Sequence, residues 1–253
     1  MVSQPDSADH PIKASLAVFI VLVVASVTLC IWVFLRSKSG DGLRATEPRF
    51  AEKRTAHPVT TEKRTAHPVT TEMSQRSDAQ SKRQAPPLDL EGTDGKVHSL
   101  AATTKDGPLV LLFIRYNCPC SETAQPFFNR LWQGYHEKVA FLGVINGDMT
   151  QAKEWQSSNS VPFPILPDPT ESVIRSYKAE HSAYSALIIP NGDLEKLWPG
   201  FSKTMLLTLS KRLAELAGQE PADLQVADAP DEMYSGCPFK WTSAAEKPAA
   251  GEQ

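Results

Sequence analysis

Two cysteines separated by one proline, Cys118-Pro119-Cys120, are the residues of this chain whose types and spacing are best suited to chemistry. A cysteine reacts, or binds a metal, as its thiolate. A helix N-terminus favours the thiolate, because unpaired backbone N–H groups and the helix dipole attract negative charge there. Pro119 suits the first helical position, where its missing N–H would have no partner. We therefore expect redox or metal chemistry at this pair.

The segments around the two cysteines predict a strand and a helix that position them. The unbroken apolar run Leu109–Ile114 is typical of a buried parallel strand. The strand should deliver Cys118 and Cys120 to the start of a helix, with Arg115 close enough to help hold the thiolate charge. The predicted helix has one apolar face, which is formed by Ala124, Phe127, Phe128, Leu131, Trp132 and Tyr135.

The rest of the predicted domain alternates strands with helices in the order ββαβαβαββα. Helices that alternate with buried strands predict one α/β domain with helices on both faces of the sheet. The first two strands flank Asp94-Gly95 as a hairpin. The later strands are expected at 139–145, 163–166, 185–189 and 194–198, and the later helices at 150–158, 170–178 and 206–216.

Several motifs of this predicted domain resemble one known family. Cys118 stands five residues after Phe113, and two later segments read Phe163-Pro164-Ile165-Leu166-Pro167-Asp168-Pro169 and Leu187-Ile188-Ile189-Pro190-Asn191-Gly192. These motifs resemble the thioredoxin-fold redoxin group, which includes peroxiredoxin-like (AhpC/TSA-type) and membrane-tethered thiol-disulfide oxidoreductase proteins. The resemblance implies a thioredoxin-like fold with a central mixed sheet over residues 86–218, and a reactive thiol at Cys118.

Other positions depart from the patterns of that group. A thioredoxin-type site would have its second cysteine at position 121, where Ser121 stands. A peroxiredoxin site would have proline at 111 and threonine or serine at 115, and the chain has Leu111 and Arg115. The cis-proline of thioredoxins should fall near Ala183. The resemblance therefore indicates the fold and leaves the activity open.

A second resemblance lies within the same fold. The segment from Glu180 to Gly192 is similar to the histidine loop of Sco-type copper chaperones, which are also tethered by a single span. That family's ligands are two cysteines and this histidine, so the resemblance implies a copper site at Cys118, Cys120 and His181. Glu122 stands where the second Sco cysteine would fall. Thiolates with one imidazole suit copper.

Three functions follow as hypotheses. The first is a membrane-anchored thiol-disulfide oxidoreductase or peroxiredoxin-like antioxidant enzyme without a cofactor. Cys118 would attack a protein disulfide, a small thiol's disulfide or a peroxide, and Cys120 or Cys237 would resolve the product. The second is a copper-binding chaperone. The third is a redox-inactive module that keeps the fold for protein binding.

The segments before and after the predicted domain are expected to lack a core. An N-terminal tail of 1–13 precedes an uncharged stretch at 14–35, whose length predicts one transmembrane helix. Residues 36–85 are polar, carry two identical ten-residue repeats and are expected to be a disordered linker. Residues 219–253 are expected to be a tail that carries Cys237. The net charge of −3 gives no indication of nucleic-acid binding.

Two features of the sequence disagree on which side of the membrane the domain lies. Lys13 precedes the predicted span, whereas Arg36, Lys38 and Arg44 follow it, and this bias would place the domain in the cytoplasm. Paired thiols on a membrane anchor suit an oxidising compartment. We expect the extracytoplasmic, periplasmic side.

Overall fold

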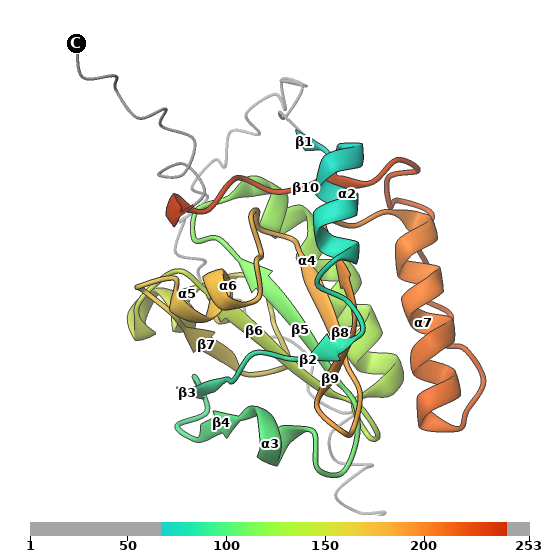
Figure 1. Ribbon diagram of the computed structural model, residues 1–253, viewed down its shortest axis with the longest axis horizontal. Helices are drawn as coiled ribbons and strands as arrows, with labels where there is room; N and C mark the ends of the chain where they lie inside the picture. The colour runs from blue at the N-terminus through green and yellow to red at the C-terminus, as the bar shows by residue number, and fades with distance from the viewer. Residues whose placement is uncertain (1–66, 242–253) are drawn as a thin grey trace, which may run out of the picture. The chain divides into compact units, whose positions relative to one another are not determined.

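Residues 67–241 are described by the computed structural model, whose main sheet has the order β2-β9-β8-β5-β6-β7 (Figure 1). Two further pairs, β1-β10 and β3-β4, complete the strands of this part of the chain. The strands are β1 His67–Pro68, β2 Arg83–Gln84, β3 Asp89–Glu91, β4 Val97–Ser99, β5 Leu109–Ile114, β6 Ala140–Ile145, β7 Ile165–Pro167, β8 Ser185–Ile188, β9 Asp193–Trp198 and β10 Tyr234–Ser235. The helices are α2 Thr71–Asp78, α3 Leu100–Thr103, α4 Pro119–Tyr135, α5 Met149–Ser158, α6 Ser172–Ser176 and α7 Lys203–Ala217.

The strand β5 is central, and its six residues are all buried. It pairs in parallel with β6 and antiparallel with β8, so the sheet is mixed, as predicted. Successive side chains of a strand point to opposite faces. Val110 and Ile114 therefore belong to one core cluster, and Leu111 and Phe113 to the other. Burial on both faces explains why the apolar run in the sequence is unbroken.

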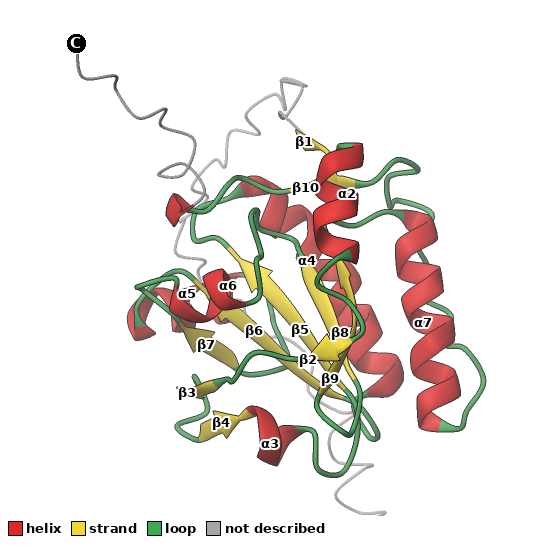
Figure 2. Cartoon of the chain, viewed as in Figure 1, coloured by secondary structure: helices red, strands yellow, loops and turns green. Residues whose placement is uncertain are grey.

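Helices cover both faces of the sheet, which confirms the predicted α/β architecture (Figure 2). Apolar residues of α4 and α7, with Trp155 of α5, form the core on one face. Met73 of α2 and Ile174 of α6 belong to the core on the other face. The hairpin β3-β4 and the elements from β5 to α7 lie within a few residues of their predicted positions.

The folded part begins earlier than predicted, so the expectation of a disordered linker up to residue 85 is wrong for 67–85. The helix α2 buries Met73 and is capped at its N-terminus by Thr70, whose side chain accepts a hydrogen bond from the Met73 N–H. The strand β2 adds to the edge of the main sheet by pairing antiparallel with β9. This segment is attached by one large apolar side chain and by backbone pairing. Neither leaves a periodic apolar pattern in the sequence, which is why the segment was predicted to be disordered.

The C-terminal segment is also packed on the domain as far as residue 241, contrary to the expected coreless tail. Leu224 and Val226 join one core cluster, and Phe239, with 0 % of its surface exposed, joins the other. Tyr234–Ser235 pairs with His67–Pro68, so the first and last described strands form one small sheet. The red C-terminal segment crosses the edge of the sheet at which β5 leads into α4 (Figure 1).

Some expectations concern other parts of the chain. The N-terminal tail 1–13, the transmembrane helix at 14–35, the linker from 36 to 66 and the tail beyond 241 lie outside the described residues. Within residues 67–241, none of the helices has the length and apolar character needed to span a bilayer.

Candidate active site

Cys118 lies at the junction of β5 and α4, as the sequence predicts. The loop after Ile114 turns at Asn117, whose φ of 58° is in the left-handed region that asparagine tolerates. Cys118 is the N-cap residue of α4, and Pro119 is the first helical residue. The Cys118 side chain makes no capping hydrogen bond to the backbone of the helix.

The Cys118 sulfur is enclosed by hydrogen-bonding groups. The residue has 0 % of its surface exposed. The Ser182 hydroxyl oxygen lies 3.3 Å from Sγ, and the backbone N–H of Cys237 donates to Sγ with an N···S distance of 3.3 Å. The Sγ atom of Cys237 is 3.0 Å from that of Cys118. Donors that converge on a buried sulfur stabilise its anion.

These contacts separate the pKa values of the three thiols. The hydrogen bond with Cys120 is the largest influence on Cys118, and together with Cys237 and Ser182 it lowers the pKa of Cys118 to about 3, against the effect of burial. The pKa of Cys120 is raised, chiefly by the same hydrogen bond. Burial, and then the bond to Cys118, raises the pKa of Cys237. At neutral pH the site thus holds one thiolate and two thiols.

Cys237 reaches the site because the C-terminal segment pairs with the loop before β8. The Ser182 N–H donates to the Cys237 carbonyl at 3.0 Å, and the Gly236 N–H donates to the Ser182 carbonyl at 2.8 Å. A Cβ at Gly236 would lie 1.9 Å from the Ser182 hydroxyl oxygen. Only glycine fits there, so the approach of the two segments depends on Gly236.

A buried carboxylate fastens the segment just beyond Cys237. Glu171 is only 4 % exposed, and its two oxygens accept hydrogen bonds from the backbone N–H groups of Lys240 and Trp241 at 3.3 and 3.1 Å. The Trp241 indole N–H donates to the Ala179 carbonyl at 3.2 Å. Phe239 is also buried, and because the Gly236 N–H bonds to the Ser182 carbonyl, the segment is held on both sides of Cys237.

The structure places Arg115 beside Cys237. The positive charge and a side-chain hydrogen bond of Arg115 lower the pKa of Cys237, against the larger raising effects of burial and of Cys118. The causes that lower the pKa of Cys118 are instead the surrounding thiols and the Ser182 hydroxyl. Arg115 was predicted to stabilise the Cys118 thiolate. In the structure it instead favours the ionised form of Cys237.

The structure brings three of the four predicted site cysteines and histidines together. The Sγ atoms of Cys118, Cys120 and Cys237 all lie within 4.8 Å of one another. His181 is not part of this cluster. Its ring stacks on that of Tyr184 with a centroid distance of 6.2 Å, and its backbone bridges to Pro238.

Sequence reasoning missed Ser182 and Glu171. Ser182 immediately precedes Ala183, the residue that stands where a thioredoxin has its cis-proline, and this proximity is the signal that could have identified it. Glu171 carries no such signal, since the two C-terminal N–H groups that it binds lie 69 and 70 residues away in the chain.

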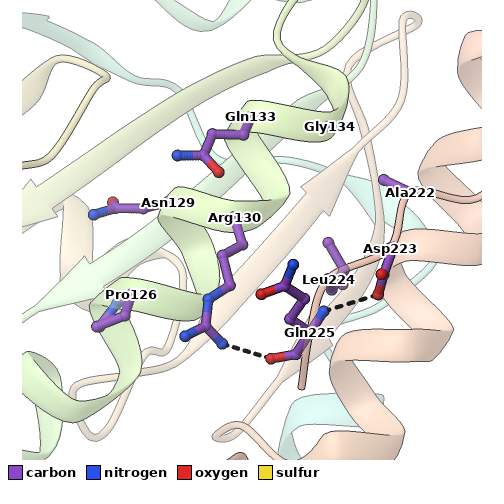
Figure 3. Close-up of a pocket in the computed structure, with 9 residues that line it drawn as sticks. All are labelled: Pro126, Asn129, Arg130, Gln133, Gly134, Ala222, Asp223, Leu224 and Gln225. Carbon is purple, nitrogen blue, oxygen red and sulfur yellow. Dashed lines mark hydrogen bonds between the residues drawn. The ribbon is translucent and has the colours of Figure 1, made fainter. Parts of the chain in front are cut away.

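Two cavities flank α4. One of about 280 Å³ lies beside Cys120, and its lining residues are Cys120, Thr123, Phe201, Asp228, Pro230, Tyr234 and Ser235. The other, of about 480 Å³, lies between α4 and residues 222–225 and has no cysteine in its lining (Figure 3). Across its mouth Arg130 donates to the Gln225 carbonyl at 2.7 Å, which attaches the start of the C-terminal segment to α4.

Comparisons with known proteins agree with this architecture. Residues 82–196 match the model of the AhpC/TSA family. A conserved, uncharacterized protein from Geobacillus kaustophilus is 24% identical with a TM-score of 0.50, over 66% of this chain and 93% of that one. A candidate protein disulfide isomerase from Bacteroides thetaiotaomicron is 19% identical with a TM-score of 0.50, over 55% of this chain and 91% of that one. These likenesses concern the fold, which is thioredoxin-like. No curated protein matches the chain.

Proposed function

With residues 82–196 identified as an AhpC/TSA family domain, we propose that the protein is a redox enzyme that uses Cys118 as its nucleophile and Cys237 as its resolving thiol. One observation carries the choice of Cys237 over Cys120. The Cys118 and Cys237 sulfurs are 3.0 Å apart, so a disulfide of about 2.05 Å needs an approach of only about 1 Å. The alternative partner, Cys120, is two residues from Cys118 in the chain, and a bond between them requires a bent backbone.

The proposed reaction is thiol-disulfide exchange. The Cys118 thiolate attacks one sulfur of a substrate disulfide, and the other sulfur leaves as a thiolate that takes up a proton. The Cys237 thiol then loses its proton and attacks the Cys118 sulfur of the mixed disulfide, which releases the second substrate thiol. The substrate disulfide is reduced to two thiols, and the enzyme leaves the reaction with a Cys118–Cys237 disulfide, which a second dithiol must reduce.

The burial of Cys118 supports a second substrate, a hydroperoxide. With 0 % of Cys118 exposed, a small oxidant reaches the sulfur more readily than a folded protein does. The thiolate would attack the terminal peroxide oxygen to give a sulfenic acid and an alcohol or water. The Cys237 thiol would then displace water to form the same disulfide.

Each neighbouring group has a role in this scheme. Cys120 and Ser182 donate hydrogen bonds that keep Cys118 ionised, and Arg115 favours deprotonation of Cys237 at the resolving step.

The proposed enzyme is anchored in the membrane by the helix predicted at 14–35, with its domain on the periplasmic side. An alkaline-phosphatase fusion after residue 66 tests this orientation and should be active in cells.

Mass spectrometry of the oxidised full-length protein tests the pairing. After treatment with glutathione disulfide, or with hydrogen peroxide in a separate sample, a Cys118–Cys237 disulfide should form while Cys120 stays open to alkylation. Cys237→Ser should instead accumulate a mixed disulfide, or a sulfenic acid, on Cys118. A Cys118–Cys120 disulfide in the unsubstituted protein would contradict the proposal. An absence of any disulfide would favour the redox-inactive binding module.

A further inference from the structure

We propose that Cys118, Cys120 and Cys237, once all are reduced, form a three-thiolate binding site for Cu(I). The site goes beyond the proposed redox function, although it uses the same thiols. It also replaces the ligand set expected from the sequence, because the C-terminal segment supplies a third sulfur where His181 was expected.

The spacing of the sulfurs fits one ion. Metal–thiolate bonds of about 2.3 Å arranged in a triangle place the sulfurs roughly 4 Å apart. The three Sγ atoms lie within 4.8 Å of one another, and those of Cys118 and Cys237 are 3.0 Å apart. The cluster therefore needs movements of about 1 Å to enclose an ion, and those movements open the Cys118–Cys237 pair rather than close it.

Two parts of the chain hold the three ligands in place. Cys118 is the N-cap of α4, and Cys120 is the second residue of that helix, so the rigid helix start holds two sulfurs. Cys237 is held by the hydrogen bonds of its own segment to Ser182. Ligands fixed on both sides by backbone contacts lose little conformational freedom when an ion binds.

The donor set favours Cu(I) over Zn(II). Thiolates are soft ligands that select Cu(I). Structural zinc sites are almost always four-coordinate, whereas the cluster in the described part of the chain has three members. The positive charge of Arg115 beside Cys237 offsets part of the negative charge of the thiolates.

Anaerobic titration of the reduced full-length protein with Cu(I), against a coloured Cu(I) chelator, tests this site. Cys30→Ser serves as the parent variant, since it removes the remaining cysteine of the chain. One Cu(I) per protein should bind, and X-ray absorption should find three sulfur neighbours. Adding Cys120→Ser, which removes one of the three sulfur ligands, should weaken Cu(I) binding roughly tenfold or more.

His181→Ala is the matched control, because it removes the histidine expected from the sequence and leaves the three sulfurs. It should bind Cu(I) as the parent does. A loss of binding in His181→Ala, unchanged binding in Cys120→Ser, or two sulfur neighbours in the absorption spectrum would overturn the three-thiolate site. Failure to bind Cu(I) together with normal formation of the Cys118–Cys237 disulfide would refute this inference and leave the redox function standing. Tighter retention of Zn(II) than of Cu(I) would refute the choice of ion.

Discussion

At the scale of the residue, the most consequential feature is a thiolate that the fold removes from water. An isolated buried charge is costly, and here Cys120, Cys237 and Ser182 compensate for the lost solvent by hydrogen bonding to Cys118. The pKa of Cys118 falls to about 3 from an ordinary value of 9.0. Between these values the folded protein binds one proton fewer at this thiol than the unfolded chain does. The contribution of Cys118 to stability is thus complete above about pH 9 and declines as the pH falls toward 3.

The ultraviolet absorbance of thiolates tests this ionisation without any reagent. The difference in absorbance between the reduced protein and Cys118→Ser should stay constant from about pH 8 to pH 5 and decline only in more acidic solution. Ser182→Ala, which removes one donor from the sulfur, should shift that decline to higher pH. If the absorbance difference instead declines between pH 9 and pH 8, Cys118 has the pKa of an ordinary thiol and this prediction is wrong.

The sequence did not allow a choice between Cys120 and Cys237 as the partner of Cys118. The Cys118 position itself follows from a local pattern, an apolar strand followed by proline at a helix start. Its proximity to Cys237 arises from chain packing across 119 residues, which no local pattern encodes. Sequence reasoning therefore identified the three thiols and left their pairing open.

At the scale of the element, the strands and helices with many buried residues were predictable, and those attached by few contacts were not. The six buried residues of β5 and the apolar face of α4 give strong periodic signals. By contrast, α2 contributes Met73 as its one large buried side chain, and β1 and β10 are two residues long. Such segments acquire structure from tertiary contacts rather than from their own pattern.

The boundary of the domain can be tested with two fragments. The fragment 67–253 should be more stable than 86–253, because the shorter one lacks β2 and the buried side chain of Met73. Burial of a methionine side chain is worth about 1.5–3 kcal/mol. The ion pair of Arg76 with Glu180 should add less than about 1 kcal/mol, since the Arg76 side chain is 55% exposed. Equal thermal unfolding midpoints for the two fragments would place the boundary back at residue 86.

The close approach of Gly236 to Ser182 gives a prediction for the C-terminal segment. Gly236→Ala should cost about 1–3 kcal/mol of stability, because its Cβ would overlap the Ser182 hydroxyl. It should also detach the segment and so raise the rate at which Cys118 is alkylated. Leu207→Ala on the exposed side of α7 is the control and should change neither quantity. Unchanged alkylation of Cys118 in Gly236→Ala would mean that the segment does not govern access.

At the scale of the whole molecule, we expect the C-terminal segment to control entry to the site. Cys118 is fully buried, and the residues around Cys237 lie against it, so a reagent gains access when this segment lifts. The rate of Cys118 alkylation should first rise with reagent concentration and then level off at the rate of opening. Quenched labelling followed by mass spectrometry measures this curve. A rate that stays proportional to reagent would instead indicate entry through the cavity beside Cys120.

The 119-residue separation of Cys118 and Cys237 also has a consequence for the newborn chain. A ribosome adds residues from the N-terminus at about 5–20 per second, so Cys118 is made roughly 6 to 24 s before Cys237. During that interval the strand, the helix start and Cys120 are already in the chain, while the cover and the resolving thiol are not. Each molecule therefore passes through a period of synthesis in which Cys118 lacks both its cover and its resolving thiol. The last segment to be made is the one that ends this period.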